Sequence, residues 1–142
     1  NVSGGLDMLK AFTQKSKKIN KKIKVLGFII LTSFNNKSLK EIGHTKFVEQ
    51  LVIKQVSLLK KSGASGCICS AKEAKIIRKK FKNFYIVSPG IRLPGDRVDD
   101  QARVMTPRDA FKNKVSAIVM GRSLIKKNIK NNVKKLIYNL NQ

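Results

Sequence analysis

Short apolar runs alternate with helix-like segments along this chain, and this alternation constrains the fold more than any other feature. Four of the runs have the length of a strand: Val25–Leu31, Ser65–Cys69, Phe84–Val87 and Ala117–Met120. Near-continuous apolar runs are typical of strands that a parallel sheet buries on both faces. Because strands that alternate with helices form βα units, the 142 residues predict an α/β fold.

Helix signals fill the intervals between these runs. The expected helices are residues 7–18, a possible short helix within 35–43, 47–59, 71–80, a helix opened by Thr106-Pro107, and a last helix of about 128–139. Ser70 and Glu73 are spaced as in a capping box, and Ser62-Gly63 supplies a glycine cap. Four βα units within about 120 residues make roughly half of a (β/α)8 barrel, as a single domain of residues 1–142. A small open α/β sheet is the alternative.

Chemistry is expected where the strands end, because parallel α/β folds bind ligands at the carboxyl ends of their strands. The four ends carry hydroxyl groups, glycines and arginines: Leu31-Thr32-Ser33, Cys69-Ser70-Ala71, Ser88-Pro-Gly-Ile-Arg92 and Met120-Gly-Arg-Ser123. In the last two ends an arginine closely follows a glycine. Glycine lets backbone N–H groups approach an anion, and a guanidinium group grips phosphate oxygens in a fork. These ends predict a phosphate site, with two surface arginines beside turn glycines as the alternative.

Longer strings resemble the orotidine 5'-phosphate decarboxylase family. They are Val87-Ser-Pro-Gly-Ile-Arg-Leu-Pro-Gly95, Asp100-Gln101 with Arg103, Met105-Thr-Pro107 and Val119-Met-Gly-Arg122. Upstream, residues 31–33 and 69–71 fall in the family's order, and Asn1-Val-Ser-Gly-Gly5 is similar to the end of its fourth strand. The resemblance covers nearly the whole chain. It implies the C-terminal half of a (β/α)8 TIM barrel that is usually a homodimer.

The resemblance also implies an activity, the conversion of orotidine 5'-monophosphate to UMP and CO2 in de novo pyrimidine biosynthesis, without a cofactor. Carried over by position, Arg92, Gln101, Gly121 and Arg122 match the family's phosphate-binding residues. Thr32 matches the hydroxyl that hydrogen-bonds the pyrimidine. Gln101, on a long loop, would swing its amide onto the phosphate, and this closure would use phosphate binding energy to exclude water.

One part of the family pattern is absent from these 142 residues. The family's catalytic string is D-x-K-x-x-D, whose lysine protonates the carbanion left when CO2 departs. The nearest candidate, Asp7-Met-Leu-Lys10, has the wrong spacing. The chain by itself is therefore predicted to be inactive. Two interpretations remain open: part of a decarboxylase, or a catalytically silent phosphate-binding half-barrel.

The net charge of +23 also admits a basic RNA-binding domain. The basic residues are 25 Lys and 6 Arg, although Arg is the better reader of bases. Lys, Asn and Ile are all abundant, and AT-rich codons enrich these three residues. Because the chain has few aromatic side chains for stacking, the composition favours coding bias and solvated lysines over nucleic-acid binding.

The remaining features argue against a membrane protein and against a metal site. No apolar run reaches the roughly 18 residues that would indicate a membrane span. No signal peptide is visible, and Cys67 and Cys69 are too close together to staple a fold, so a cytoplasmic location is expected. These cysteines and the single histidine, His44, do not complete a tetrahedral metal site, which predicts packed thiols and a surface imidazole. A first residue other than Met indicates a fragment or a processed chain.

Overall fold

The structure is a computed structural model that describes residues 1–96 and 104–142. Its strands are β1 (Leu26–Phe28), β2 (Gly66–Ile68), β3 (Tyr85–Ser88) and β4 (Ala117–Ile118). They form one parallel sheet in the sequential order β1-β2-β3-β4. Parallel strands in sequential order, joined by helices, are the winding of a (β/α)8 barrel. The predicted α/β architecture is therefore confirmed, as an open part of such a barrel.

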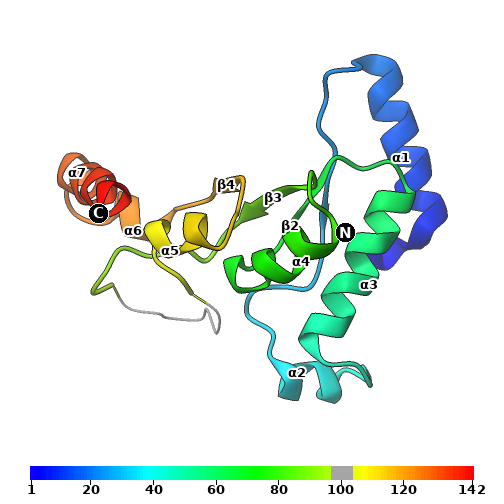
Figure 1. The fold of residues 1–142 in the computed structure, drawn as a ribbon, viewed down its shortest axis with the longest axis horizontal. Coiled ribbons are helices and arrows are strands. Elements are labelled where there is room, and N and C mark those ends of the chain that lie inside the picture. Colours follow the sequence, from blue (N-terminus) through cyan, green and yellow to red (C-terminus); the bar gives the residue numbers. More distant parts are fainter. Residues whose placement is uncertain (97–103) are drawn as a thin grey trace.

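Helices follow the strands along the whole chain. They are η1 (Val2–Gly4), α1 (Gly5–Ile19), α2 (Asn36–Glu41), α3 (Val48–Lys61), η2 (Ala71–Glu73), α4 (Ala74–Lys80), α5 (Pro107–Lys112), α6 (Arg122–Ile125) and α7 (Ile129–Asn141). Figure 1 shows α1 and α3 at one end of the sheet and α5, α6 and α7 at the other. The sequence predicted all of these except η1 and α6.

Two of the three predicted caps form as expected. The Thr106 hydroxyl accepts a hydrogen bond from the Asp109 N–H at 3.2 Å, with proline at the first position of α5. Gly63 has a φ of 77° just after α3, a conformation that favours glycine. Ser70 is also an N-cap, but of the 3₁₀ turn η2 that precedes α4. Its hydroxyl accepts a hydrogen bond from the Lys72 N–H at 3.3 Å.

Three strands, β1, β2 and β4, are shorter than their apolar runs, and β2 covers only Gly66–Ile68 of the run Ser65–Cys69. β1 ends at Phe28, whereas the run continues to Leu31. The Ile29 N–H still donates to the Ile68 carbonyl at 3.3 Å, but the Ile30 N–H donates to Oε1 of Gln55 on α3 at 2.9 Å. The Gln55 side chain thus accepts the hydrogen bond of a backbone N–H that could have extended the pairing of β1 with β2, and the strand pairing stops there. The strand β4 likewise ends at Ile118 and not at the predicted Met120.

One face of the sheet is covered by helices. Gly27, Cys67 and Ile86 are neighbours across β1, β2 and β3, and all three are buried. A Cβ atom on Gly27 would lie 2.0 Å from a methyl carbon of Leu59 on α3. Leu59 is itself fully buried, so the main core lies between this face and the helices that follow β1 and β2.

The opposite face is only half covered. Phe28, Ile68, Val87 and Ala117 are neighbours in register on this face, and each is half-buried. Val119, just beyond β4, is 53% exposed. In a closed barrel such a row points inward, where layers of side chains from all the strands fill the interior. The chain therefore presents an apolar inner face that its four strands alone do not enclose.

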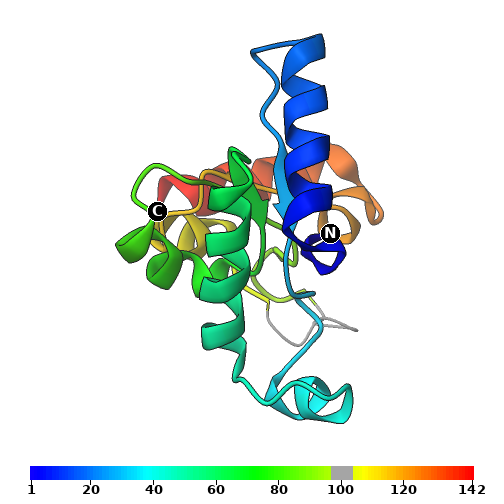
Figure 2. The same cartoon turned by 90° about the vertical axis from the view of Figure 1, so that its right-hand side faces the viewer.

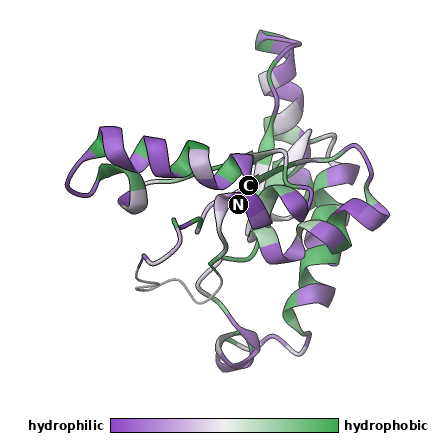
Figure 3. Ribbon diagram, turned by 60° about the vertical axis from the view of Figure 1, so that its left-hand side comes forward, coloured by the Kyte–Doolittle hydropathy of each residue, from purple (hydrophilic) through white to green (hydrophobic). Residues whose placement is uncertain are grey.

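Helix α7 also exposes apolar side chains. It packs against α5 and α6, yet Ile129, Ile137 and Leu140 are 57%, 53% and 41% exposed. Figure 3 shows apolar residues, in green, among polar ones along this helix. Their helical spacing places these three side chains on one side, so α7 carries a second uncovered apolar surface.

His44 is exposed, and Cys67 and Cys69 are buried free thiols with their Sγ atoms 4.0 Å apart. The expectations of a surface imidazole and of packed thiols are confirmed.

Within residues 1–96 and 104–142, no group of three or more metal-binding side chains comes together. Over the same residues, no helix has the length and apolarity needed to cross a membrane.

Two glycines provide a matched test of the packing. A Cβ atom on Gly66 would lie 2.0 Å from the Tyr85 carbonyl oxygen, whereas one on Gly121 would meet nothing within 4 Å. We expect Gly66→Ala to lower the free energy of unfolding by about 1–3 kcal/mol, because the backbones of β2 and β3 must separate. Gly121→Ala should change it by less than about 0.5 kcal/mol. Urea unfolding followed by circular dichroism measures both, and equal effects would contradict the close strand approach at Gly66.

Candidate functional site

A cleft of about 400 Å³ lies at the carboxyl edge of the sheet. Four of the five predicted site residues line it: Thr32 after β1, Arg92 after β3, and Gly121 and Arg122 after β4. The fold thus gathers residues that are far apart in the sequence. The fifth predicted residue, Gln101, lies outside the described residues.

The loop after β3 positions Arg92. Gly90 has a φ of 75°, which favours glycine, and the next residue forms a parallel bridge with Met105. The Arg92 N–H donates to the Met105 carbonyl at 3.0 Å. These bonds fix the backbone of Arg92 against the far side of the same loop.

The Arg92 side chain is only 8% exposed. Its Nη1 donates to the Ile91 carbonyl at 3.1 Å, whereas Nε and Nη2 are buried without a hydrogen-bond partner among the described residues. A buried charged group with unused donors costs free energy unless an acceptor satisfies them. An anion in the cleft would supply such acceptors.

The Gly121-Arg122 pair starts the short helix α6. The Gly121 carbonyl accepts from the N–H groups of Leu124 and Ile125, at 2.8 and 3.2 Å. Since a Cβ atom at Gly121 would meet nothing within 4 Å, packing inside this chain does not require glycine there. The missing side chain instead leaves the backbone accessible from the cleft, next to the half-buried guanidinium of Arg122.

The charged side chains that line the cleft, among the described residues, are all positive. Two guanidinium groups, from Arg92 and Arg122, belong to its wall, and none of the described residues that line it is acidic. Guanidinium groups bind phosphate oxygens through charge-assisted, forked hydrogen bonds. The cleft therefore suits a phosphate group that carries a double negative charge.

A sequence model described as the Orotidine 5'-phosphate decarboxylase / HUMPS family matches residues 1–136. The chain belongs to this family. The strings around Arg92 and Arg122 thus come from a match that extends over nearly all of the chain.

Two curated relatives carry the name orotidine 5'-phosphate decarboxylase. The protein from Coxiella burnetii (strain RSA 331 / Henzerling II) is 39% identical over 127 residues, which are 87% of this chain and 54% of the relative. The protein from Buchnera aphidicola subsp. Acyrthosiphon pisum (strain Tuc7) is 37% identical over 137 residues, 96% of this chain and 57% of the relative. The chain spans about half the length of the curated relatives it matches.

Solved structures agree on the fold. An uncharacterized conserved protein from Geobacillus kaustophilus matches with a TM-score of 0.76 at 23% identity, over 99% of this chain and 61% of that one. Orotidine 5'-phosphate decarboxylase from Lactobacillus acidophilus matches with a TM-score of 0.65 at 30% identity, over 84% of this chain and 50% of that one. The four-stranded sheet of this family member thus has the shape of part of a larger fold.

The cleft wall has further residues that the sequence did not single out as binding residues. These are Phe28, Leu31, Ser33, Pro89, Gly90 and Val119. Two buried hydroxyls lie in the strand ends that the sequence named, but neither was predicted as a binding residue. The Oγ atoms of Ser88 and Ser123 have no hydrogen-bond partner in the described part of the chain. The only sequence signals for them are their positions: Ser88 ends a strand, and Ser123 directly follows Gly-Arg.

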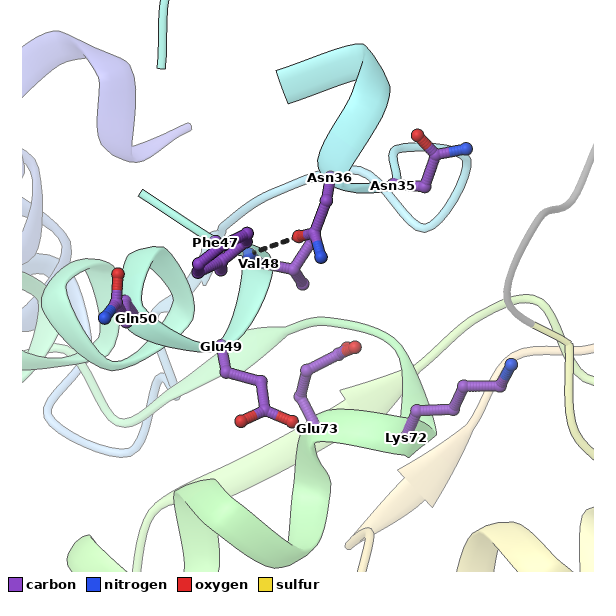
Figure 4. A pocket seen from close by; sticks show the side chains of 8 residues that line it. All are labelled: Asn35, Asn36, Phe47, Val48, Glu49, Gln50, Lys72 and Glu73. Carbon is purple, nitrogen blue, oxygen red and sulfur yellow. Dashed lines mark hydrogen bonds between the residues drawn. The ribbon is translucent and has the colours of Figure 1, made fainter. Parts of the chain in front are cut away.

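A second cleft, of about 560 Å³, has the opposite chemistry (Figure 4). Glu49, in the first turn of α3, and Glu73, in η2, lie next to each other along its wall. The Asn36 side chain stabilises the fold, since its Oδ1 accepts a hydrogen bond from the Val48 N–H at 2.9 Å. Two carboxylates and one ammonium group, that of Lys72, line this cleft, so it repels phosphate where the first cleft attracts it.

Proposed function

We propose that this chain supplies the phosphate-binding half of an orotidine 5'-phosphate decarboxylase, an enzyme that converts orotidine 5'-monophosphate to UMP and CO2. One observation carries the proposal: four of the five residues predicted from the family strings meet in one cleft that contains two arginines and no described carboxylate. The family membership and the names of the relatives support the class of nucleotide.

Each residue has a role in this proposal. Arg92 and Arg122 bind the phosphate, and the open backbone at Gly121 lets it approach. Thr32, after β1, belongs to the wall of the same cleft, and its hydroxyl hydrogen-bonds the pyrimidine. Gln101 belongs to the same proposal through its place in the Asp-Gln string, as a further phosphate ligand.

In this proposal the cleft residues bind the substrate and take no part in breaking its bonds. None of the described residues that line the cleft is a lysine or a carboxylic acid, so the wall supplies no proton donor for a carbanion. The chain's contribution to catalysis is binding energy from the phosphate, which an enzyme uses to position the reacting base and to exclude water. We extend the proposal to the whole enzyme as a cytoplasmic homodimer that needs no cofactor.

A pair of ligands tests the phosphate site directly. We expect UMP to bind the 142-residue chain at least about tenfold more tightly than uridine, because charge-assisted hydrogen bonds to the phosphate contribute more than about 1.4 kcal/mol. Isothermal titration calorimetry at low salt measures both affinities, and inorganic phosphate should compete with UMP. Equal affinities for UMP and uridine would refute the proposal.

A further inference from the structure

The described acidic residues of this chain are confined to one edge of the sheet. Every described acidic residue lies at the start of a helix or in a segment that follows a strand. These residues are Asp7, Glu41, Glu49, Glu73, Asp96 and Asp109. In a parallel βα fold such segments lie at the carboxyl edge of the sheet, which is the edge of the phosphate cleft.

Lysines crowd the opposite edge. The helix ends and turns that lead into β1, β2, β3 and β4 carry thirteen lysines, all of them exposed. We call this set the lysine edge: Lys15, Lys17, Lys18, Lys21, Lys22, Lys24, Lys60, Lys61, Lys79, Lys80, Lys82, Lys112 and Lys114. No acidic residue occurs in these four segments.

Side-chain contacts join the four turns into one surface. Lys17 Nζ donates to the Gly63 carbonyl at 2.8 Å, which links the first turn to the second. Lys24 Nζ lies 4.5 Å from the centre of the Tyr85 ring, at the start of β3. Arg78, in the last turn of α4, donates to the Phe84 carbonyl at 2.9 Å and to the Lys114 carbonyl at 3.0 Å, which links the third turn to the fourth.

The end of α1 extends this surface. Figures 1 and 2 both show the end of α1 and the turn that follows it projecting away from the rest of the molecule. Residues 15–24, which include six members of the lysine edge, make up the end of α1 and the segment that follows it.

This charge is not neutralised within the described part of the chain, where none of the lysine-edge residues forms an ion pair. Helix dipoles favour lysines in last turns, such as Lys60 and Lys61 of α3. They do not account for Lys21, Lys22 and Lys24, which lie beyond the end of α1. The excess of positive charge thus continues past the helix ends into the turns.

Although the composition by itself favours solvated lysines over nucleic-acid binding, their placement along one edge leads us to a different conclusion: we propose that the lysine edge binds the sugar–phosphate backbone of single-stranded RNA. Adjacent strands lie about 4.8 Å apart, so the segments that lead into them are neighbours, and a linear polyanion laid along them meets several lysines at once. Each neutralised phosphate releases counterions, which drives the association. Since Lys is a point charge and Arg reads bases better, we expect binding without sequence preference.

A membrane is the other extended polyanion, and the side chains of this edge favour it less. Peripheral membrane binding draws on a buried apolar face as well as on charge. Along the lysine edge the exposed large apolar side chains are Ile19, Ile23 and Phe111. They belong to the segments that lead into β1 and β4, the two outer strands of the sheet.

The test compares two variants of equal net charge. In one, four lysine-edge residues become glutamine: Lys21, Lys22, Lys79 and Lys80. In the matched control, four exposed lysines outside the edge become glutamine: Lys37, Lys40, Lys130 and Lys134. Fluorescence anisotropy of a labelled oligo(U) measures affinity at several salt concentrations, and circular dichroism verifies that both variants stay folded.

We expect the edge variant to bind about tenfold or more weakly and to show a salt slope shallower by about 0.7 for each phosphate that it no longer neutralises. The control should stay within about threefold of the wild type. Equal losses of affinity in the two variants would overturn the proposal, since net charge alone would then explain binding. Displacement of RNA by UMP would also overturn it, as would binding to phosphatidylserine vesicles without binding to oligo(U).

Discussion

The 142-residue chain alone will convert orotidine 5'-monophosphate to UMP no faster than buffer does. The chain lacks the D-x-K-x-x-D spacing, and no described residue of the phosphate cleft can protonate a carbanion. The inner face of the sheet, including the half-buried Phe28 of the cleft wall, is also not enclosed by these four strands. Water therefore reaches the place where a closed barrel would exclude it.

Activity should appear when the missing catalytic groups are supplied in trans. We expect decarboxylation when this chain is co-expressed with the part of the Coxiella burnetii relative that lies outside the match, where the family pattern places the D-x-K-x-x-D string. The control is the same segment with that lysine changed to alanine. Release of CO2 is measured after purification from a host without its own decarboxylase. Activity of the chain alone would refute the prediction, and a folded but inactive pair would favour the silent half-barrel.

The order of elements was predictable because each βα unit is encoded locally. The apolar run of β3 and the Thr106-Pro107 start of α5 depend on neighbours a few residues away. The end of β1 was not predictable in this way. It depends on Gln55, which lies 25 residues downstream and whose side chain takes the Ile30 N–H. Composition and periodicity contain no information about such a contact.

The site was predictable for a different reason. The family strings fix the residue types around Arg92 and Arg122, and the parallel topology brings the strand ends to one edge. The burial of Arg92 with unused donors was not predictable, since it arises from the Ile91–Met105 bridge across the loop. The lysine edge could not be predicted from the composition either, because the net charge does not tell where the lysines lie in the fold.

Arg92→Met will make the unliganded chain more stable and will remove the preference for UMP over uridine. Methionine has an unbranched apolar side chain that fills the buried space without leaving Nε and Nη2 unsatisfied. Replacing poorly compensated buried charge by apolar groups is often stabilising, by about 1–4 kcal/mol. Loss of the charged interaction with phosphate should cost about 1.5–3 kcal/mol in UMP binding, which is roughly ten- to 150-fold.

The two effects of this substitution have opposite signs, and this separates a binding role from a structural one. If Arg92 instead served to hold the loop together, its replacement by methionine would lower both the stability of the chain and its affinity for UMP. The control is Arg108→Met, since the half-buried Arg108 lies outside the lining of the phosphate cleft. It should leave the UMP preference unchanged. Urea unfolding and calorimetry with UMP and uridine measure both quantities. A less stable Arg92→Met chain that still prefers UMP would show that the buried guanidinium serves the fold and not the ligand.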